Sequence, residues 1–264
     1  MNPLKAVKGE YVKEMLSKGT REEGREMLEY RPIKIRHSLL PNAEGSAQVE
    51  IGNTKVLVGI KLDVATPMAD KPTDGNLMTM AELLPLASPD YESGPPSPDS
   101  IELARVVDRG IRAAGVVDLS SLFIETDKVW SVFVDIYVLN YDGNLFDACT
   151  LAAMAALNNT RMPIYDSQNK STIREGKLEK LKISNMVTSC TFAKVNGKIL
   201  LDADGAEEGV MEGRVTIATD DKVIRAMQKG LPGAFSEQEL DHLIDKTFEK
   251  AKELRDIINS STSD

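Results

Sequence analysis

Short runs of alternating apolar and polar residues in the first part of the chain predict β-strands. Residues 33–36 alternate in this way, and so do residues 47–51 and 56–60, which flank the pair Gly52-Asn53. A period of two places the apolar side chains on one face of a strand, and such a pair between two runs is typical of a two-residue hairpin. We therefore predict an antiparallel pair of strands with one buried face.

Apolar residues near the start of the chain recur with the period of a helix. Residues 3–18 should form an amphipathic helix that Asn2 caps, that Pro3 begins and that Gly19 follows. Its expected apolar face comprises Leu4, Val7, Tyr11, Val12 and Met15. Residues 20–31 are rich in charge and should be irregular, leading into the first strand.

We expect a second helix after a long proline-rich segment. Residues 63–99 contain seven prolines, which leaves room for at most a short strand near Leu77–Leu84. Ser97 can cap the helix and Pro98 suits its first position. The predicted buried stripe comprises Ile101, Ala104, Val107, Ile111 and Ala114. Another face carries Arg105, Arg109 and Arg112, spaced by four and three residues.

The remainder of the chain repeats strands followed by a helix. A strand over Trp130–Leu139 and a turn at Asp142-Gly143 should precede an alanine-rich helix over residues 146–158, whose small side chains would allow close approach to a sheet. The expected elements of the second half are strands at Lys182–Ile183, Thr191–Val195, Ile199–Leu201 and through Val215 and Ile217, with a hairpin at Asn196-Gly197. Ser236 and Glu239 form a capping box that should start a closing helix. Its apolar face comprises Leu240, Leu243, Ile244, Phe248, Ala251 and Leu254.

This order of elements predicts an α/β protein of the mixed-sheet, α+β-like class. We expect an N-terminal helix and entry arm over residues 1–30 and one domain over residues 31–260. The domain would have approximate halves 31–165 and 166–260, and residues 261–264 would form a tail.

Composition and charge exclude several classes of protein. The chain of 264 residues has no run of 18 apolar residues that could span a membrane, and its start lacks the apolar core of a signal peptide. We therefore expect a cytoplasmic protein. The net charge of −9 is unlike that of a general nucleic-acid coat, so any contact with RNA would need a local basic patch or a basic partner.

The residues that usually hold metals or perform nucleophilic catalysis are sparse. Cys149 and Cys190 lie in apolar or small-residue runs without CxxC spacing, which predicts buried free thiols. His37 and His242 lack neighbours at ligand spacing, so neither a metal site nor a histidine-based triad is predicted. No glycine-rich phosphate loop of the Walker or dinucleotide type appears either, which argues against an unrelated small-molecule enzyme on a similar fold.

Five segments, taken in order, resemble the RNase PH family. Residues 20–31 are similar to its entry motif R-x-D-G-R, which stands here as Arg21, Glu23, Gly24 and Arg25 with glutamate in place of aspartate. The segment EGSAQVEIGNTKVLV resembles the hairpin of the family. Residues 101–112, 134–158 and 200–218 resemble its central helix, its strand–turn–helix unit and its acidic active-site region. The resemblance covers roughly residues 20–260, and the order and spacing of the motifs make it specific.

The resemblance implies a mixed fold of two related halves, a ring of six subunits and 3′→5′ phosphorolysis of RNA. In that reaction phosphate attacks the terminal linkage and releases a nucleoside diphosphate. It also implies that inorganic phosphate is the co-substrate of the complex and that this chain binds no cofactor. The chemistry needs donors that hold phosphate against its like-charged target, together with an acid or a metal-binding pair of carboxylates.

The positions that match the chemistry of the family are altered here. Two acids six residues apart in active members correspond to Glu208 and Arg214, and the phosphate-holding arginine corresponds to Leu145. Loss of a general acid costs roughly 10²–10⁴ in rate, and leucine cannot donate a hydrogen bond. We interpret Glu207 and Glu208 as part of a solvated acidic loop.

This pattern is similar to that of the non-catalytic RNase PH-like subunit of the archaeal exosome. The resemblance implies a catalytic sister subunit, a ring of three heterodimers, RNA-binding cap subunits and single-stranded RNA. Arg105, Arg109 and Arg112 would contact RNA phosphates. The alternative for these arginines is a solvated face on which Glu102 and Asp108 pair some of the charge. Two other functions stay open, namely an exoribonuclease that is active by itself and a ring scaffold that never touches RNA.

Overall fold

The structure of the protein is a computed structural model that describes residues 3–261. The cap expected at Asn2 and the expected tail residues 262–264 lie outside the described part, and so do the side chains of Leu4 and Val7.

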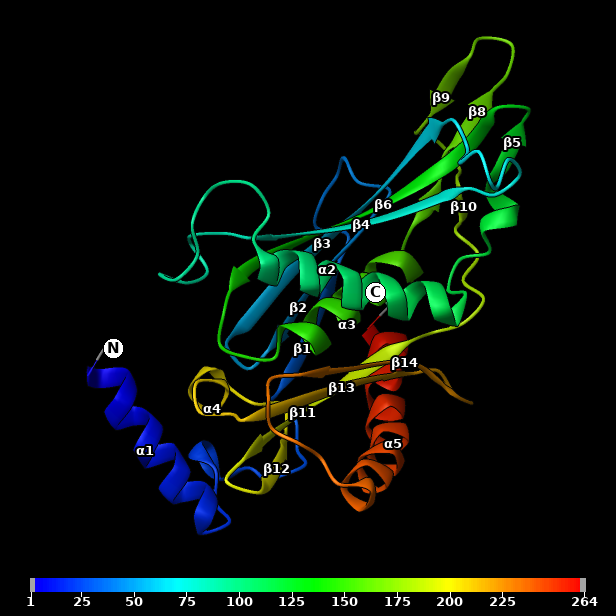
Figure 1. The fold of residues 1–264 in the computed structure, drawn as a ribbon. Helices are drawn as coiled ribbons and strands as arrows, with labels where there is room; N and C mark the ends of the chain where they lie inside the picture. Colours follow the sequence, from blue (N-terminus) through cyan, green and yellow to red (C-terminus); the bar gives the residue numbers. More distant parts are fainter. Residues whose placement is uncertain (1–2, 262–264) are drawn as a thin grey trace.

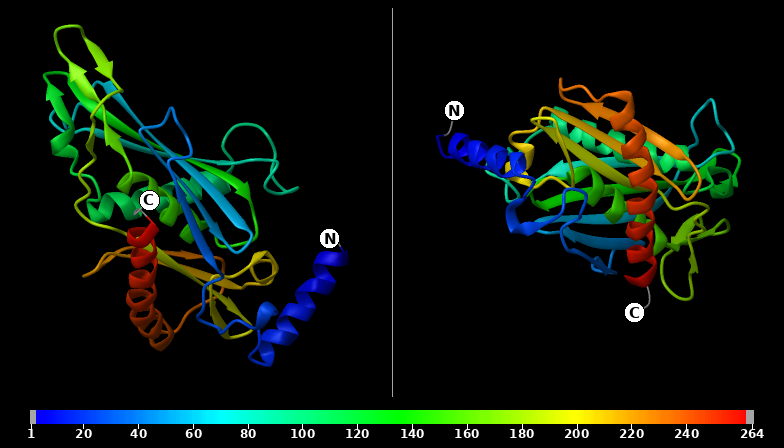
Figure 2. Two further views of the ribbon diagram at one scale, coloured as in Figure 1. Left: turned by 180° about the vertical axis from the view of Figure 1, so that it is seen from behind. Right: turned by 90° about the horizontal axis from the view of Figure 1, so that it is seen from below.

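Two β-sheets form the layers of the molecule (Figures 1 and 2). The larger sheet has the strand order β1 (Ile33–His37), β2 (Gly45–Ile51), β3 (Thr54–Ala65), β6 (Lys128–Asn140) and β4 (Asn76–Leu83), and β5 (Phe123–Glu125) also pairs with β6. Its neighbours are antiparallel except for β4 and β6, which are parallel. The smaller, antiparallel sheet has the order β12 (Lys198–Leu201), β11 (Thr188–Val195), β13 (Gly213–Thr219) and β14 (Ile224–Gly230).

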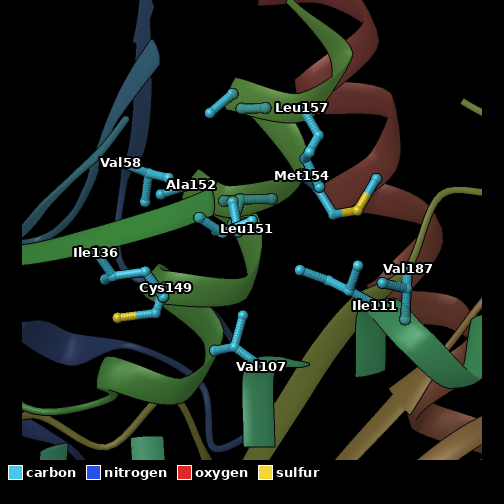
Figure 3. Close-up of a cluster of buried hydrophobic side chains, with 14 of the residues drawn as sticks. Val58, Val107, Ile111, Ile136, Cys149, Leu151, Ala152, Met154, Leu157 and Val187 are labelled. Atoms are coloured by element: carbon cyan, nitrogen blue, oxygen red, sulfur yellow. The ribbon is translucent and has the colours of Figure 1, made fainter. Parts of the chain in front are cut away.

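Two helices lie between these sheets and form the centre of the core. α3 (Leu145–Asn158) contacts β2 and β3 of the larger sheet and β11 of the smaller one, whereas α2 (Pro98–Ala114) contacts β4 and β14. Figure 3 shows Leu151, Met154 and Leu157 of α3 close to Val107 and Ile111 of α2. Every residue of α3 from position 146 to 157 is buried. The alanines of this helix permit the close packing that the sequence predicts, because they add little volume between the two layers.

The remaining helices pack on the outside of this core. α5 (Glu237–Ser261) packs against β11, β13 and β1, and the expected capping box joins the backbone N–H groups of Ser236 and Glu239 to each other's side chains. α1 (Pro3–Ser17) contacts α4 (Gly205–Glu208), and its Val12 and Leu16 enter a second, smaller hydrophobic cluster. The arm between α1 and β1 contains a single short 3-10 turn, η1 (Glu22–Gly24), and another such turn, η2 (Leu119–Leu122), precedes β5.

Most of the local signals in the sequence are confirmed. Gly52 has a φ of +55° in the hairpin between β2 and β3, and Asn196 and Gly197 both have positive φ in the hairpin between β11 and β12. The Ser97 hydroxyl accepts the Ser100 N–H at the start of α2. Cys149 and Cys190 are buried free thiols.

Several predictions of burial and of strand position are wrong. Tyr11 and Ile101 are 54% and 47% exposed, although the helical period predicts both on buried stripes. Ile101 lies one turn before Arg105, on the outward face of α2, while Leu103 and Val106 are buried instead. Ile183 forms only an isolated bridge with Val117, so Lys182–Ile183 is not a strand.

Some elements are not predicted by the sequence pattern at all. They are β5, β14, α4 and two small sheets that pair β7 (Arg161–Met162) with β10 (Glu179–Lys180) and β8 (Ile164–Asp166) with β9 (Ser171–Ile173). These elements are short or lie at a sheet edge, where neither hydrophobic period is complete enough to indicate a strand or a helix.

Candidate functional site

The three altered positions come together around one cavity of about 580 Å³. Leu145 stands at the start of α3, Glu208 at the end of α4 and Arg214 in β13, and all three line this cavity. Leu83, Tyr91 and the first turns of α2 complete the wall. The tertiary structure therefore brings together residues that are up to 69 positions apart in the sequence.

Glu208 is held by hydrogen bonds from within the fold. Its carboxylate accepts the Tyr141 hydroxyl at 2.6 Å and the Asn144 backbone N–H at 2.8 Å. Burial raises the pKa of Glu208, and these hydrogen bonds offset the rise only in part. Both of its carboxylate oxygens thus have partners that belong to the turn before α3.

Glu207 is buried as well, so the prediction of a solvated acidic loop is wrong. Asp204 caps α4 and forms a capping box with Glu207, whose residue exposure is 2%. Arg21 donates to both oxygens of this carboxylate, from Nε at 2.8 Å and from Nη2 at 2.7 Å. The sequence pattern misses this burial because the cation that covers Glu207 lies far away in the entry arm.

Arg214 is anchored on two sides. Its Nη2 donates to Oε1 of Glu102 at 2.8 Å, and its guanidinium lies 4.2 Å from the centre of the Phe146 ring. The side chain is 14% exposed, and its Nε has no hydrogen-bond partner among the described residues. Glu102 is therefore paired with Arg214, whereas the sequence alone offers it as a partner for arginines of its own helix.

Leu145 leaves the first turn of α3 without a side-chain donor toward the cavity. The residue packs against the hydrophobic core. Asn144, which precedes it, makes no side-chain cap and instead donates through Nδ2 to Asp147 and Asp202.

The charge around the cavity is strongly negative. Among the side chains that the structure describes, five carboxylates and one cation line it, and that cation, Arg214, is already paired; the carboxylates are Asp90, Asp99, Glu102, Asp142 and Glu208. Two unit charges 4 Å apart interact by about 4 kcal/mol near a protein surface. An incoming phosphate would therefore be repelled from this cavity.

A buried ionic network is hydrogen-bonded to Asp142 and Asn144 of the turn before α3, and the sequence pattern does not predict it. Arg31 donates from Nε and Nη2 to the two oxygens of Asp202, each at 2.8 Å. Burial alone would raise the pKa of Asp202, but the hydrogen bonds and charge of Arg31 outweigh burial and lower it. Arg25 of the entry motif also reaches Asp202, at 3.3 Å. The motif arginines are visible in the sequence, but their partners about 170–190 residues away are not.

The arginine face of α2, which comprises Arg105, Arg109 and Arg112, is exposed as the helical spacing predicts. Arg112 is bound within the fold, since Nε donates to Asp108 at 2.9 Å and Nη2 donates to the Leu77 carbonyl at 2.7 Å. Arg109 donates to Oε1 of Gln228 at 2.7 Å. Arg105 has no hydrogen bond or ion pair within residues 3–261. The face thus contains one free, one lightly held and one engaged cation.

Metal and membrane sites are not apparent in the described part of the chain. No group of three or more His, Cys, Asp or Glu side chains there is arranged to hold a metal ion. None of the helices between residues 3 and 261 is long and apolar enough to cross a membrane.

The fold and the cavity identify the class of protein to which the chain belongs. Residues 29–163 match domain 1 of the 3′ exoribonuclease family, RNase PH, and residues 185–250 match its domain 2. The chain is a member of this family.

Individual relatives are similar over nearly the whole length. The chain is 43% identical over 260 residues to a protein of Thermococcus onnurineus named "Exosome complex component Rrp42", covering 97% of this chain and 96% of that one. It is 46% identical to a protein of the same name from Thermococcus gammatolerans, over 92% and 91% of the two chains. A chain of the Archaeoglobus fulgidus exosome, solved with RNA bound to the active site, superimposes with a TM-score of 0.90 at 42% identity, covering 97% of this chain and 99% of that one.

Proposed function

We propose that the chain is a non-catalytic subunit of an archaeal exosome. In this role it shapes the active site of a catalytic RNase PH-like sister subunit and helps to bind RNA for phosphorolytic 3′→5′ degradation. The observation that carries the proposal is the cavity around Leu145, Glu208 and Arg214, where the groups that the chemistry needs are missing or engaged. The names of the relatives support the same role.

Each step of phosphorolysis would fail in this cavity for a physical reason. The attacking phosphate needs cationic or amide donors, but Leu145 supplies none and five carboxylates repel it. The leaving oxygen needs an acid, but Glu208 is hydrogen-bonded to Tyr141 and to the backbone of Asn144. Arg214 at the second acidic position would also repel a metal ion.

The partners follow from the same proposal. The chain alternates with its sister in a ring of three heterodimers, the cap subunits bring RNA to the ring, and inorganic phosphate is the co-substrate of the complex. Arg105, Arg109 and Arg112 contact phosphates of single-stranded RNA. The assembly works in the cytoplasm. Within the chain, we propose an N-terminal arm over residues 1–30 and a domain with approximate halves over residues 31–165 and 166–260.

Phosphate-dependent degradation of a short unstructured RNA tests the catalytic part of the proposal. The chain alone, the sister alone and the co-expressed pair are compared for release of nucleoside diphosphate. We expect the chain to be inert and to raise the activity of the sister strongly. Degradation by the chain alone would instead favour an intrinsically active exoribonuclease.

Neutralising the three arginines of α2 tests the RNA-binding part. In the assembled ring the triple alanine variant should flatten the dependence of log K on log salt, by about 0.7 for each RNA phosphate that the variant no longer neutralises. An unchanged slope would favour a structural scaffold without RNA contact.

A further inference from the structure

A continuous set of polar contacts links the arginine face of α2 to Arg214 in the cavity. Arg109 donates from Nη2 to Oε1 of Gln228 at 2.7 Å, and Nε2 of Gln228 lies 3.4 Å from Oε1 of Glu102. The same oxygen of Glu102 accepts from Nη2 of Arg214 at 2.8 Å. The set joins α2 with β14 and β13, which are neighbours in the smaller sheet. We call Arg109, Gln228, Glu102 and Arg214 the relay.

The two hydrogen-bond partners of Gln228 determine the orientation of its side-chain amide. Its oxygen faces the guanidinium of Arg109 and its nitrogen faces the carboxylate of Glu102. The flipped amide would place N–H groups against the cation and the oxygen against the anion, which is unfavourable at both ends. A fixed Glu102 therefore fixes the amide, and the amide in turn holds Arg109.

Arg214 is the rigid end of the relay. Its guanidinium stacks on Phe146, and it stands directly opposite Gly230 in the pairing of β13 with β14. A Cβ at Gly230 would lie 2.7 Å from Nη2 of Arg214. The absence of a side chain at position 230 thus makes the space that the guanidinium occupies.

We propose that Arg214 is a positioning residue for RNA binding, a proposal that rests on the function proposed above. Through Glu102 and Gln228 it holds the guanidinium of Arg109 in one orientation on the outer face of α2. Arg214 also neutralises Glu102, which lies one helical turn before Arg105 and would otherwise attract that free cation away from RNA. The arginine at a position that is acidic in active members therefore serves the RNA-binding face of the same subunit.

Preorganisation explains why such an arrangement would help. A long, free arginine loses side-chain freedom when it binds a phosphate, and an arginine already held in place loses less. Arg109 keeps the rest of its guanidinium for RNA, because Nη2 is the atom that donates to Gln228.

The test measures RNA affinity of the ring assembled with its sister, over a series of salt concentrations. Three single variants cut the relay in different ways. Arg214→Met removes the guanidinium that pairs with Glu102. Gln228→Met, at a half-buried position, removes the amide between Arg109 and Glu102. Gly230→Ala displaces the Arg214 guanidinium while keeping its charge. Each should weaken RNA binding and flatten the salt slope by up to about 0.7 for each copy that contacts RNA, the change that we also expect of Arg109→Ala. Between 50 and 200 mM salt, this slope change means that the RNA affinity of the variant falls about 2.6-fold less than that of the parent ring.

A matched control and a double variant separate positioning from general damage. Lys194→Met removes a cation that pairs with Glu239 and lies over the Phe235 ring, in the same sheet but outside the relay, and should leave RNA binding unchanged. Arg214→Met should have a smaller effect in the Arg109→Ala background than in the parent ring, because only its influence on Arg105 through Glu102 remains. Arg214→Lys, which keeps the charge beside Glu102, should restore part of the binding.

The proposal is overturned if Gln228→Met and Gly230→Ala bind RNA like the parent ring, or if the effects of Arg214→Met and Arg109→Ala simply add. Gln228 lies on an edge strand, so its variant tests the relay even where Arg214→Met does not assemble. Failure of the RNA-binding function proposed above has a different signature. In that case the triple alanine variant of Arg105, Arg109 and Arg112 would leave the salt slope unchanged.

Discussion

The three arginines of α2 should contribute unequally to RNA binding, because the fold engages them to different extents. Arg105 has no hydrogen bond or ion pair among the described residues. Arg112 is bound to Asp108 and to the carbonyl of Leu77 on the edge strand β4. A guanidinium that already donates to the protein has fewer donors left for phosphate.

The structure sets the magnitudes for two alanine variants. Arg105→Ala should flatten the salt slope by about 0.7 for each phosphate it neutralises and change the free energy of unfolding by less than about 0.5 kcal/mol. Arg112→Ala loses an exposed ion pair one turn away, worth about 0.3–0.5 kcal/mol. It also loses the hydrogen bond from the Arg112 guanidinium to the Leu77 carbonyl, and a hydrogen bond of a charged group contributes about 1.5–3 kcal/mol. Because the Arg112 side chain is 45% exposed, we expect a total near the low end, about 1–2 kcal/mol, with a smaller change in the slope than Arg105→Ala gives.

Two assays on the same samples separate these outcomes. Urea unfolding of the ring or of its heterodimer gives the stability change, and RNA titrations at several salt concentrations give the slope. Arg36→Ala, which removes an exposed arginine from β1, controls for the change in net charge. Equal flattening by the Arg105 and Arg112 variants, without loss of stability in the second, would refute the reasoning from side-chain engagement.

Three further predictions concern the buried acids and the cavity. Glu207→Ala leaves the fully buried Arg21 without its bidentate partner and should cost about 3–5 kcal/mol in urea unfolding, whereas removing the exposed Glu253 beside Lys250 should cost little. Burial raises the pKa of Asp147 to about 6 in the folded protein from an ordinary value of 3.8, so the native state binds the proton more tightly. The contribution of Asp147 to the free energy of unfolding should therefore fall by about 2 kcal/mol as the pH rises from about 4 to about 6. Denaturation of the parent and of Asp147→Asn at each pH measures this contribution as the pH dependence of the difference between them. Leu145→Arg should not create phosphorolysis, because the acidic lining remains; release of nucleoside diphosphate by that variant would show that a missing cation was the only defect.

Local chemistry explains which parts of the fold could be predicted from the sequence. The hairpin at Gly52-Asn53, the start of α2 at Ser97 and the capping box at Ser236 depend on residues within a few positions of one another. Side-chain caps and positive φ values act over that range, whatever the rest of the chain does. The alanine-rich composition of α3 likewise indicates a helix close to a sheet. The motif positions at Leu145, Glu208 and Arg214 can be named from their order along the chain.

Only the tertiary structure decided how the charged residues are used. Glu207 looks solvated in the sequence, yet Arg21, 186 residues away, buries it with a bidentate ion pair. Glu102 looks like a partner for its own helix, yet it pairs with Arg214, 112 residues away. The sequence does not indicate whether a carboxylate faces water or a buried cation. The free-energy cost of burying it depends on a partner that only the packing of the chain supplies. The sequence by itself therefore determined most of the longer elements and their order, while the packing of two sheets around α2 and α3 determined which charges remain free to meet RNA.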